Sequence, residues 1–271
     1  MIPTLHMAGS ALRLVTLASV LAGSCVWADA ARADDRISVS GDGSTLTGTD
    51  GGGGGSVAWL HDFNASTVGS IAGEYQALAN AGWSFGSLSV SQGLGPANQR
   101  FNVYGELHEG AGHDDLRNFD YHIEAVGMFV TFDHRLSAQL EDKRIDVENT
   151  HGNLPKAGLS YLWNPHFMTS VSYQYSVTGN LVTRISAGRL DFYSAAVNLL
   201  AGGSYGPTLP VTFDLPTGYF AEVRRVKEGF VGASKPIPRW HSEITLVADY
   251  IDLSGIKRSI FTLTYMFHIP H

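Results

Sequence analysis

The segment Arg258-Ser-Ile-Phe-Thr-Leu-Thr-Tyr-Met-Phe-His-Ile269 decides the fold of this chain. Taken every second residue, it forms one apolar or aromatic row, namely Phe261, Leu263, Tyr265 and Phe267. The other row is more polar and includes Arg258, Thr262, Thr264 and His268. Successive side chains of a β-strand point to opposite faces, so this period of two predicts a strand. Such a strand suits either an edge of a soluble β-sandwich or the wall of a membrane barrel.

A terminal strand with aromatic residues at alternate positions resembles the closing strand of bacterial outer-membrane β-barrels. In that class the last segment typically ends in Phe and is recognised by the barrel-assembly machinery. The resemblance implies that Phe261, Leu263, Tyr265 and Phe267 form the assembly signal, with Phe267 as the terminal aromatic residue. Residues 268–271 would then be a short overhang, which departs from the pattern of the class.

Residues 1–33 have the parts of a secretory signal peptide. Arg13 provides the charge of a short N-terminal region, residues 14–27 are an apolar run, and small residues suited to cleavage follow. The segment Leu21-Ala-Gly-Ser-Cys25 is similar to a lipoprotein cleavage box, but Ala22 stands where that box usually has Leu, so we favour ordinary cleavage. Cleavage would leave no cysteine, because Cys25 is the only one in the chain. Disulfide and thiolate chemistry would then be excluded.

The composition favours a large β structure in a membrane. The chain has 271 residues, of which 44% are hydrophobic and 16% charged, with 31 Gly, 11 Tyr and 13 Phe. Soluble domains typically have roughly 25% charged residues. No stretch after residue 33 reaches the roughly 18 consecutive apolar residues of a membrane-spanning helix. The net charge of -7 and the lack of a basic cluster beyond Arg224, Arg225 and Lys227 argue against nucleic-acid binding.

Residues 34–55 are rich in Gly, Ser, Thr and Asp, and they end in five consecutive glycines. This composition predicts a flexible segment, either a linker or a mobile barrel entrance. A phosphate-binding glycine loop is disfavoured, because no Gly-Lys-Ser/Thr follows. The barrel itself is expected over residues 56–271.

From Ser56 onward, segments that alternate apolar and polar residues follow one another to the end of the chain. We count about thirteen such segments and round to about 12 strands, because single-chain bacterial barrels usually have an even number. Leu88 and Val90 fall out of phase with Trp83 and Phe85, which predicts a bulge near Gly86. Longer outer loops are expected to include residues 109–118 and 204–217, with short periplasmic turns at the other end.

Further features favour a membrane barrel over a soluble sandwich, beside the long run of adjacent strands. Glycine and alanine are frequent in the apolar rows, as at Gly69 and Gly73, where acyl chains would fill gaps that would be cavities in a core. Aromatic residues gather near strand ends, as in the two interfacial girdles of a membrane barrel: Trp59, Phe63, Trp83, Tyr161, Trp163, Tyr173, Tyr175, Trp240 and Tyr265. We therefore predict an all-β, antiparallel, up-and-down transmembrane barrel in a Gram-negative outer membrane.

The last third of the chain is similar in layout to YaiO-type barrels. The similarity covers Val231-Gly-Ala-Ser-Lys-Pro-Ile237, Trp240, Gly255 and Phe261-Thr-Leu-Thr-Tyr-Met-Phe267. It rests on spacing and strand pattern, and it implies a fold and a location. The resemblance supplies no catalytic residues.

If the apolar rows face lipid, the lumen receives charges of both signs: Arg100, Glu106, Glu124, Arg144, Glu148, Arg184, Glu222, Arg224, Glu243, Asp249 and Arg258. These charges either line a small channel for polar solutes or an exported polysaccharide, or close a structural barrel through ion pairs. The expected partners are outer-membrane lipid, the assembly machinery and, for an export role, components of an export system. We expect no cofactor.

Two chemical alternatives have weaker support in the sequence. Some outer-membrane barrels are lipid-modifying enzymes with a Ser and a His near the membrane interface, and His166 with Ser170 is the nearest candidate pair. Its surroundings lack the His-x-Ser pattern of those enzymes. His108 and His113 adjoin an acidic loop that could bind a cation, but nothing in the sequence fixes its geometry. We therefore assign no catalytic and no metal-binding residue.

Overall fold

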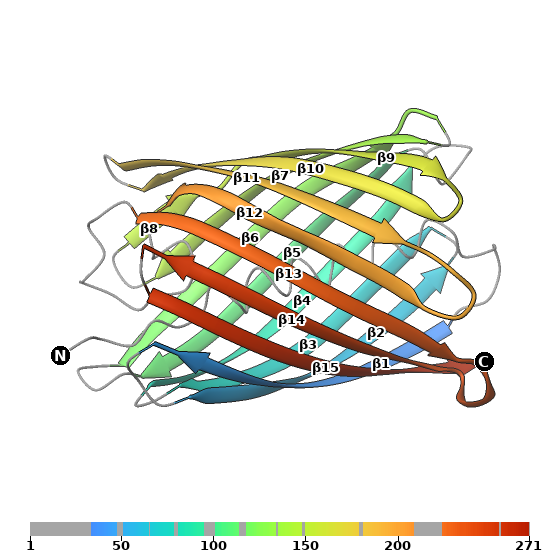
Figure 1. The fold of residues 1–271 in the computed structure, drawn as a ribbon, viewed down its shortest axis with the longest axis horizontal. Helices are drawn as coiled ribbons and strands as arrows, with labels where there is room; N and C mark the ends of the chain where they lie inside the picture. Colours follow the sequence, from blue (N-terminus) through green and yellow to red (C-terminus); the bar gives the residue numbers. More distant parts are fainter. Residues whose placement is uncertain are drawn as a thin grey trace.

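The structure, a computed structural model, describes residues 34–47, 51–64, 66–78, 81–94, 101–113, 118–133, 135–147, 150–178, 181–208, 224–254 and 256–270. Within them one antiparallel sheet closes on itself, because β1 pairs with β2 on one side and with β15 on the other (Figure 1). The strands are β1 (Asp34–Leu46), β2 (Gly52–Asn64), β3 (Thr67–Leu78), β4 (Ala81–Leu94), β5 (Phe101–His113), β6 (Asn118–Thr131), β7 (Leu136–Val147), β8 (Thr150–Asn153), β9 (Lys156–Asn164), β10 (Phe167–Thr178), β11 (Leu181–Phe192), β12 (Asn198–Thr208), β13 (Arg224–Ile237), β14 (Ser242–Leu253) and β15 (Ile256–Pro270).

The barrel wall has 14 strands, because β8 and β9 are consecutive pieces of one of them. Both pieces pair with β7 on one side and with β10 on the other. Otherwise each strand pairs with its neighbours in sequence, which is the up-and-down order that the sequence predicts. Closure leaves no sheet edge with unpaired backbone groups, as a wall surrounded by lipid requires.

The barrel has two rims. We call the rim where β1 begins and β15 ends the terminal rim, at the right of Figure 1, and the opposite one the far rim. The terminal rim has short connections, one of which contains the 3-10 helix η2 (Pro238–Trp240). The longest connection, residues 209–223, joins β12 to β13 at the far rim. In the part of the chain that the structure describes, no helix is long and apolar enough to cross a membrane.

The wall has 14 strands where about 12 were expected, because the count of about thirteen segments was rounded down and did not include β1. Residues 34–46 and 52–55 are strand rather than part of a flexible segment. They form β1 and the start of β2, with Gly41 directly opposite Gly55 and Gly43 opposite Gly53. The chain packs closely here, since a Cβ on Gly53 would lie 2.7 Å from the Asp42 carbonyl oxygen. Glycine therefore permits a close approach of two strands whose backbones are paired on both sides. The signal peptide expected in residues 1–33 lies outside the described residues.

Two other expectations about the strands are corrected. No bulge occurs near Gly86, because β4 keeps a continuous register with both β3 and β5. Trp83 and Phe85 are simply lumenal, while Leu88 and Val90 face outward. The loop expected over 109–118 is shorter, because β5 extends to His113 and β6 begins at Asn118. Likewise β12 takes residues 204–208 of the other expected loop, and the rest of that loop lies outside the described residues.

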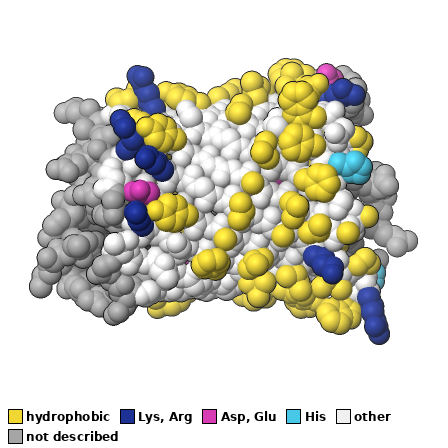
Figure 2. Space-filling model, in the orientation of Figure 1, with side chains coloured by type: hydrophobic (Ala, Val, Ile, Leu, Met, Phe, Trp, Pro, Cys, Tyr) yellow, Lys and Arg dark blue, Asp and Glu magenta, His cyan; other side chains and the backbone are white. Residues whose placement is uncertain are grey.

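The outer face carries the apolar rows. On β15, Phe261, Leu263 and Phe267 are exposed, whereas Thr262 and Thr264 on the alternate face are buried. Exposed aromatic and aliphatic residues near the terminal rim form one girdle, namely Phe63, Leu94, Phe132, Trp163, Phe192, Trp240 and Phe267. Tyr75, Tyr205 and Tyr250 are exposed nearer the far rim. The face in Figure 2 accordingly shows its hydrophobic side chains mainly towards the terminal rim. Trp83, which we expected in a girdle, is instead buried on the lumenal side.

Candidate functional site in the barrel lumen

The lumenal face contains an apolar layer near the far rim. Its members are buried and lie within the six strand residues nearest that rim: Leu46, Trp83, Phe85, Ile123, Ile145, Ile185, Val226, Ile251 and Ile260. They come from strands all around the barrel (Figure 1). The same zone also holds buried polar side chains, namely Ser44, Gln76, His108, Lys143, Ser176, Thr183 and Arg258. Only the apolar members of this layer disfavour hydrated ions, because they offer no groups to replace the water.

Towards the terminal rim the lumenal face becomes polar. Pairs of serine hydroxyls bridge neighbouring strands there, Ser70 with Ser89 at 2.7 Å and Ser160 with Ser170 at 2.9 Å. A third pair, Ser40 with Ser56 at 2.6 Å, lies nearer the middle of the barrel. Arg36 on β1 contacts Asp62 on β2 at 2.6 Å. A solute that crossed this barrel would therefore meet a zone of mixed apolar and polar side chains and a hydroxyl-rich zone in turn.

One lumenal network joins β5 to β7 across the strand between them. The Tyr104 hydroxyl donates a 2.6 Å hydrogen bond to the Glu141 carboxylate, and the Gln139 amide donates to the Tyr104 oxygen at 2.9 Å. Gly127 on β6 lies directly opposite both Tyr104 and Glu141. A Cβ on Gly127 would lie 2.3 Å from the Tyr104 ring, so the ring crosses the wall over this glycine.

Charged side chains surround this network. Glu106 on β5 lies two strands from Lys143 on β7, with the small Ala125 of β6 directly between them. Lys156 on β9 lies directly opposite Glu141 and interacts electrostatically with both Glu141 and Glu106. His108 approaches Glu106 at 3.4 Å. Two lysines and two glutamates thus form a mixed-charge cluster on one side of the lumen, and we call it the β5–β9 cluster.

Other parts of the lumen, on both flanks of this cluster, also carry charges held along the wall. The Arg189 guanidinium donates to the buried Asp191 carboxylate on the same strand, with the Nε to Oδ1 distance at 2.8 Å. Ser204 on β12 donates to Glu228 on β13 at 2.6 Å. Gln76 on β3 reaches Asp42 on β1 at 2.7 Å across Gly54, in the same way as Tyr104 crosses Gly127. The Gln76 side chain can lie along the wall because Gly54 beneath it leaves room.

The structure places four of the predicted lumenal residues on the lumenal face. Glu106 belongs to the β5–β9 cluster, and Arg258 is buried on β15. Glu243 bonds with Ser234, and Asp249 lies on the same face of β14. Four others fall where the structure describes no side chain, namely Arg100, Glu148, Glu222 and Arg224. Whether any of these residues contacts a solute stays a prediction.

The prediction is wrong for Glu124, Arg144 and Arg184, which face outward. Glu124 lies directly opposite Arg144, and both are more than half exposed. Arg184 is exposed and shares its face with the exposed Val182 and Leu190. The physical reason is strand length, because strands of 12 or more residues exceed the roughly 9–11 needed to span a bilayer. Outward positions near the far rim can therefore be charged.

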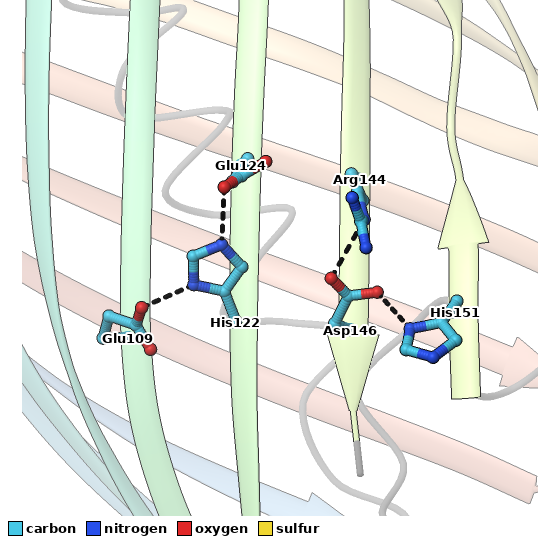
Figure 3. Close-up of polar contacts among 6 residues, drawn as sticks. All are labelled: Glu109, His122, Glu124, Arg144, Asp146 and His151. Atoms are coloured by element: carbon cyan, nitrogen blue, oxygen red, sulfur yellow. Dashed lines mark hydrogen bonds and ion pairs between the residues drawn. The ribbon is translucent and has the colours of Figure 1, made fainter. Parts of the chain in front are cut away.

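Glu124 and Arg144 belong to an outward polar cluster (Figure 3). His122 contacts Glu109 at 2.5 Å and Glu124 at 2.9 Å through its two ring nitrogens. Asp146 is contacted by Arg144 at 3.0 Å and by His151 of the next strand. These six residues are neighbours on β5 to β8, and we call them the acidic rim cluster.

Sequence reasoning missed Lys143, Lys156 and Glu141, although a usable signal was present. In residues 136–147, Leu136, Ala138 and Leu140 define the outward row. Extending that parity assigns Glu141 and Lys143 to the lumen and Arg144 to the outside. The prediction did not apply this parity, because it placed Arg144 in the lumen and left out Glu141 and Lys143.

The structure does not bring together the residues considered for an enzymatic or a metal-binding site. Ser170 bonds with Ser160 on the lumenal face, whereas His166 lies in the turn before β10 and bonds with the Tyr193 carbonyl at 2.9 Å. His108 is lumenal and His113 lies on the outward row of the same strand, so they cannot share one cation. Among the described residues, no group of three or more His, Cys, Asp or Glu is placed to hold a metal ion.

Comparison with known proteins identifies the class of fold. CymD, described as a monoaromatic hydrocarbon channel, has a TM-score of 0.62 at 8% identity, over 89% of this chain and 90% of CymD. A Pseudomonas aeruginosa FadL homologue has a TM-score of 0.60 at 7% identity, over 90% of this chain and 91% of that chain. The Pseudomonas putida toluene transporter TodX gives 0.56 at 8% identity, over 87% and 89%.

The chain is thus an outer-membrane-type β-barrel, and its structural neighbours are outer-membrane channels. Identities this low establish a shared fold alone. No protein-family model matches the chain, and a sequence search of curated proteins gives no match. The resemblance to YaiO-type barrels therefore stays a prediction.

Proposed function

We propose that this protein is an outer-membrane channel for small solutes that carry both an apolar and a polar group. The observation that carries this proposal is that most buried apolar side chains of the lumenal face lie near the far rim, among buried polar ones, whereas the face towards the terminal rim is mainly polar. An amphipathic solute finds a compatible wall in both zones. A hydrated ion would find fewer groups to replace its water in the first zone than in the second.

Location in the outer membrane is part of the same proposal, and the surface of the barrel supports it. The exposed apolar rows of β15 and its neighbours supply a lipid-facing belt, and the two levels of aromatic residues suit its interfaces. In outer-membrane barrels the long connections are extracellular and the short turns periplasmic. The far rim, which has the connection 209–223, would then lie at the outer leaflet. Export through a cleaved signal peptide in residues 1–33 completes this assignment.

The fold supports transport more than catalysis. The neighbours that share it include a protein described as a monoaromatic hydrocarbon channel and one described as a toluene transporter. Small aromatic solutes are therefore reasonable first probes of this chain. The similarity of fold supports the choice of probe, and the apolar layer supports the passage of a solute with an apolar group.

A second candidate is the passage of small polar solutes or of an exported polysaccharide, as the sequence suggested. The β5–β9 cluster and the lumenal serines favour it, because they offer charged and hydroxyl groups along the wall. A third outcome is a closed structural barrel, in which the same contacts only stabilise the wall.

Planar-bilayer recording of the purified protein separates these candidates. We expect low ion conductance for the native chain and higher conductance for Ile251→Ser, because the substitution makes the apolar layer polar. Ala248→Ser on the outer face of the same strand is the matched control and should leave conductance unchanged. Binding of toluene and of catechol, measured by calorimetry in detergent, should accompany the low conductance.

Each other outcome selects an alternative. High conductance in discrete steps that Ile251→Ser does not change would contradict the amphipathic channel and favour a polar pore. Absence of conductance in both proteins, together with no binding of either aromatic probe, would favour the closed barrel. Recovery of the protein in a soluble periplasmic fraction, without heat-modifiable gel migration, would refute the membrane location.

A further inference from the structure

Four basic side chains gather on the outer face at the far rim, over β11 to β15. They are Arg184, Arg225, Lys227 and Lys257, all exposed. Their outward direction follows from alternation, because Thr183, Val226 and Arg258 beside them are buried on the lumenal side. Figure 2 shows Lys and Arg side chains together near this rim, at the end of the hydrophobic surface. We call these four residues the basic rim patch.

The strand register makes the patch contiguous. Lys227 lies directly opposite Asp252, and Asp252 lies directly opposite Lys257, so the three form one row across three strands. Arg225 is one outward position nearer the rim, and its guanidinium lies 5.8 Å from the centre of the Tyr205 ring. The patch therefore has four cations around one carboxylate and keeps a positive excess.

The depth of the patch is set by its aromatic neighbours. Tyr205 lies directly opposite Lys227, and the exposed Tyr250 precedes Asp252 in the outward row of β14. On the other side of these tyrosines the outward rows are apolar, with Val231 on β13 and Leu246 on β14. Tyrosine at a barrel surface marks the membrane interface, with lipid head groups immediately beyond it. The basic side chains are thus at head-group depth.

The remaining circumference of the far rim has the opposite character on β5 to β8. The acidic rim cluster exposes Glu109 and Glu124, and its cations are already in contact with carboxylates. An anionic partner would be repelled there and attracted to β11 to β15. The positive surface is consequently a localised feature of one side of the barrel.

We propose that the basic rim patch binds the phosphate groups of an anionic glycolipid head group in the outer leaflet. The inference rests on the membrane location argued above. Guanidinium and ammonium groups are the common partners of phosphate, and Arg can donate two parallel hydrogen bonds to it. The occupant is a lipid because the side chains point sideways, on the same face as the apolar belt, where the neighbouring molecules are lipids. Acyl chains would lie against the apolar rows, and the phosphates would reach the patch.

The test is lipid binding by the folded full chain, measured by native mass spectrometry from detergent micelles. The probes are diphosphoryl lipid A and the same lipid without its phosphates. We expect the triple variant Arg225→Gln, Lys227→Gln, Lys257→Gln to bind the phosphorylated probe roughly fivefold more weakly for each charge removed. The dephosphorylated probe should bind weakly to both proteins.

Two further variants keep the test decisive if the triple variant folds poorly. Asp252→Asn should strengthen binding of the phosphorylated probe, because it removes the carboxylate between Lys227 and Lys257. Arg144→Gln, an outward arginine of the acidic rim cluster, is the matched control and should leave binding unchanged. Heat-modifiable migration verifies that each protein is folded.

Several outcomes would overturn the inference. Equal binding of both probes would show that phosphate is not recognised, and equal loss in Arg144→Gln would show that the site is not the basic rim patch. Displacement of the lipid by inorganic pyrophosphate would indicate a site for free phosphate. Absence of conductance in the native chain and in Ile251→Ser, together with no aromatic binding, would refute the proposed function without affecting this result. Lipid binding can likewise fail in a protein that binds the aromatic probes and conducts as expected.

Discussion

The Tyr104 hydroxyl lies 2.6 Å from the Glu141 carboxylate although a whole strand separates β5 from β7. The contact is possible because Gly127, midway between them in the same row, has no side chain. Three strands are thereby joined on the lumenal face by one hydrogen bond beyond their backbone pairing. The relationship links a glycine in the wall to the position of a lumenal charge.

Replacing this glycine should move the tyrosine. A Cβ at position 127 would lie 2.3 Å from the Tyr104 ring, so Gly127→Val forces the ring off the wall and separates it from Glu141. We expect a loss of about 1–3 kcal/mol in the free energy of unfolding, typical of overpacking. Urea unfolding in lipid vesicles measures it. Gly73→Ala is the control, because a Cβ there meets nothing within 4 Å; a similar loss in both variants would contradict the argument.

The hydrogen bond itself is tested by Tyr104→Phe. This variant keeps the ring over Gly127 and removes only the hydroxyl, which leaves the Glu141 carboxylate without this donor. A partly buried acceptor that loses its partner costs about 1–3 kcal/mol. A double-mutant cycle with Glu141→Gln isolates the contact. Additive losses would mean that the two side chains are not coupled.

The placement of the outward row of β15 against lipid is tested by introducing a charge at two depths in the bilayer. Leu263 lies in the middle of the outward row and Phe267 nearer the terminal rim, and both are exposed. A Lys on the lipid face costs about 2–4 kcal/mol at the bilayer midplane and less near the interfaces. Leu263→Lys should therefore destabilise the inserted barrel more than Phe267→Lys. Equal effects would show that the belt is placed wrongly.

The same row carries the predicted assembly signal, which needs a separate measurement. Phe267→Lys should slow insertion in cells if the machinery reads the terminal aromatic residue, even where its effect on the stability of the refolded protein is small. Outer-membrane yield after expression measures insertion. Normal yield would leave Phe267 as an ordinary girdle residue, packed against Tyr265 with ring centres 4.3 Å apart.

The fold class could be predicted because lipid-facing rows require alternation, and Phe261, Leu263 and Phe267 display it without interruption. β1 was missed for a physical reason. Its outward row continues after Val39 with Gly41, Gly43 and Thr45, so the hydrophobic period fades while the backbone pairing continues. A sequence pattern reports only the side chains of one segment. This strand is held by its pairing with β15, at the other end of the chain, and the sequence of residues 34–46 carries no sign of that pairing.

The candidate site was less predictable for a related reason. Trp83 is apolar and lumenal, and Arg144 is charged and faces outward, so residue type alone assigns both to the wrong face. The parity set by a clear apolar row in the same strand would have corrected Arg144. No such rule identifies the apolar layer, because its members come from strands far apart in sequence and meet only in the closed barrel.

The charge of the lumen is tested by two neighbouring residues on opposite faces. Lys143 is buried on the lumenal side of β7, and Arg144 points outward from the next position. Removing the lumenal cation with Lys143→Ala leaves Glu106 and Glu141 less compensated. Because a fixed charge acts strongly in a low-dielectric lumen, we expect the reversal potential in a salt gradient to shift towards cation selectivity. The variant is made in the Ile251→Ser protein, because the native chain is expected to conduct too little current for the measurement.

Arg144→Ala removes the same formal charge from the whole protein and is the matched control. Its side chain is separated from the lumen by the wall and is exposed to solvent and head groups, where screening is strong. The reversal potential should therefore stay unchanged. A shift of equal size in both variants would mean that selectivity follows net charge rather than the lumenal position of Lys143, and the β5–β9 cluster would lose its proposed part in solute preference.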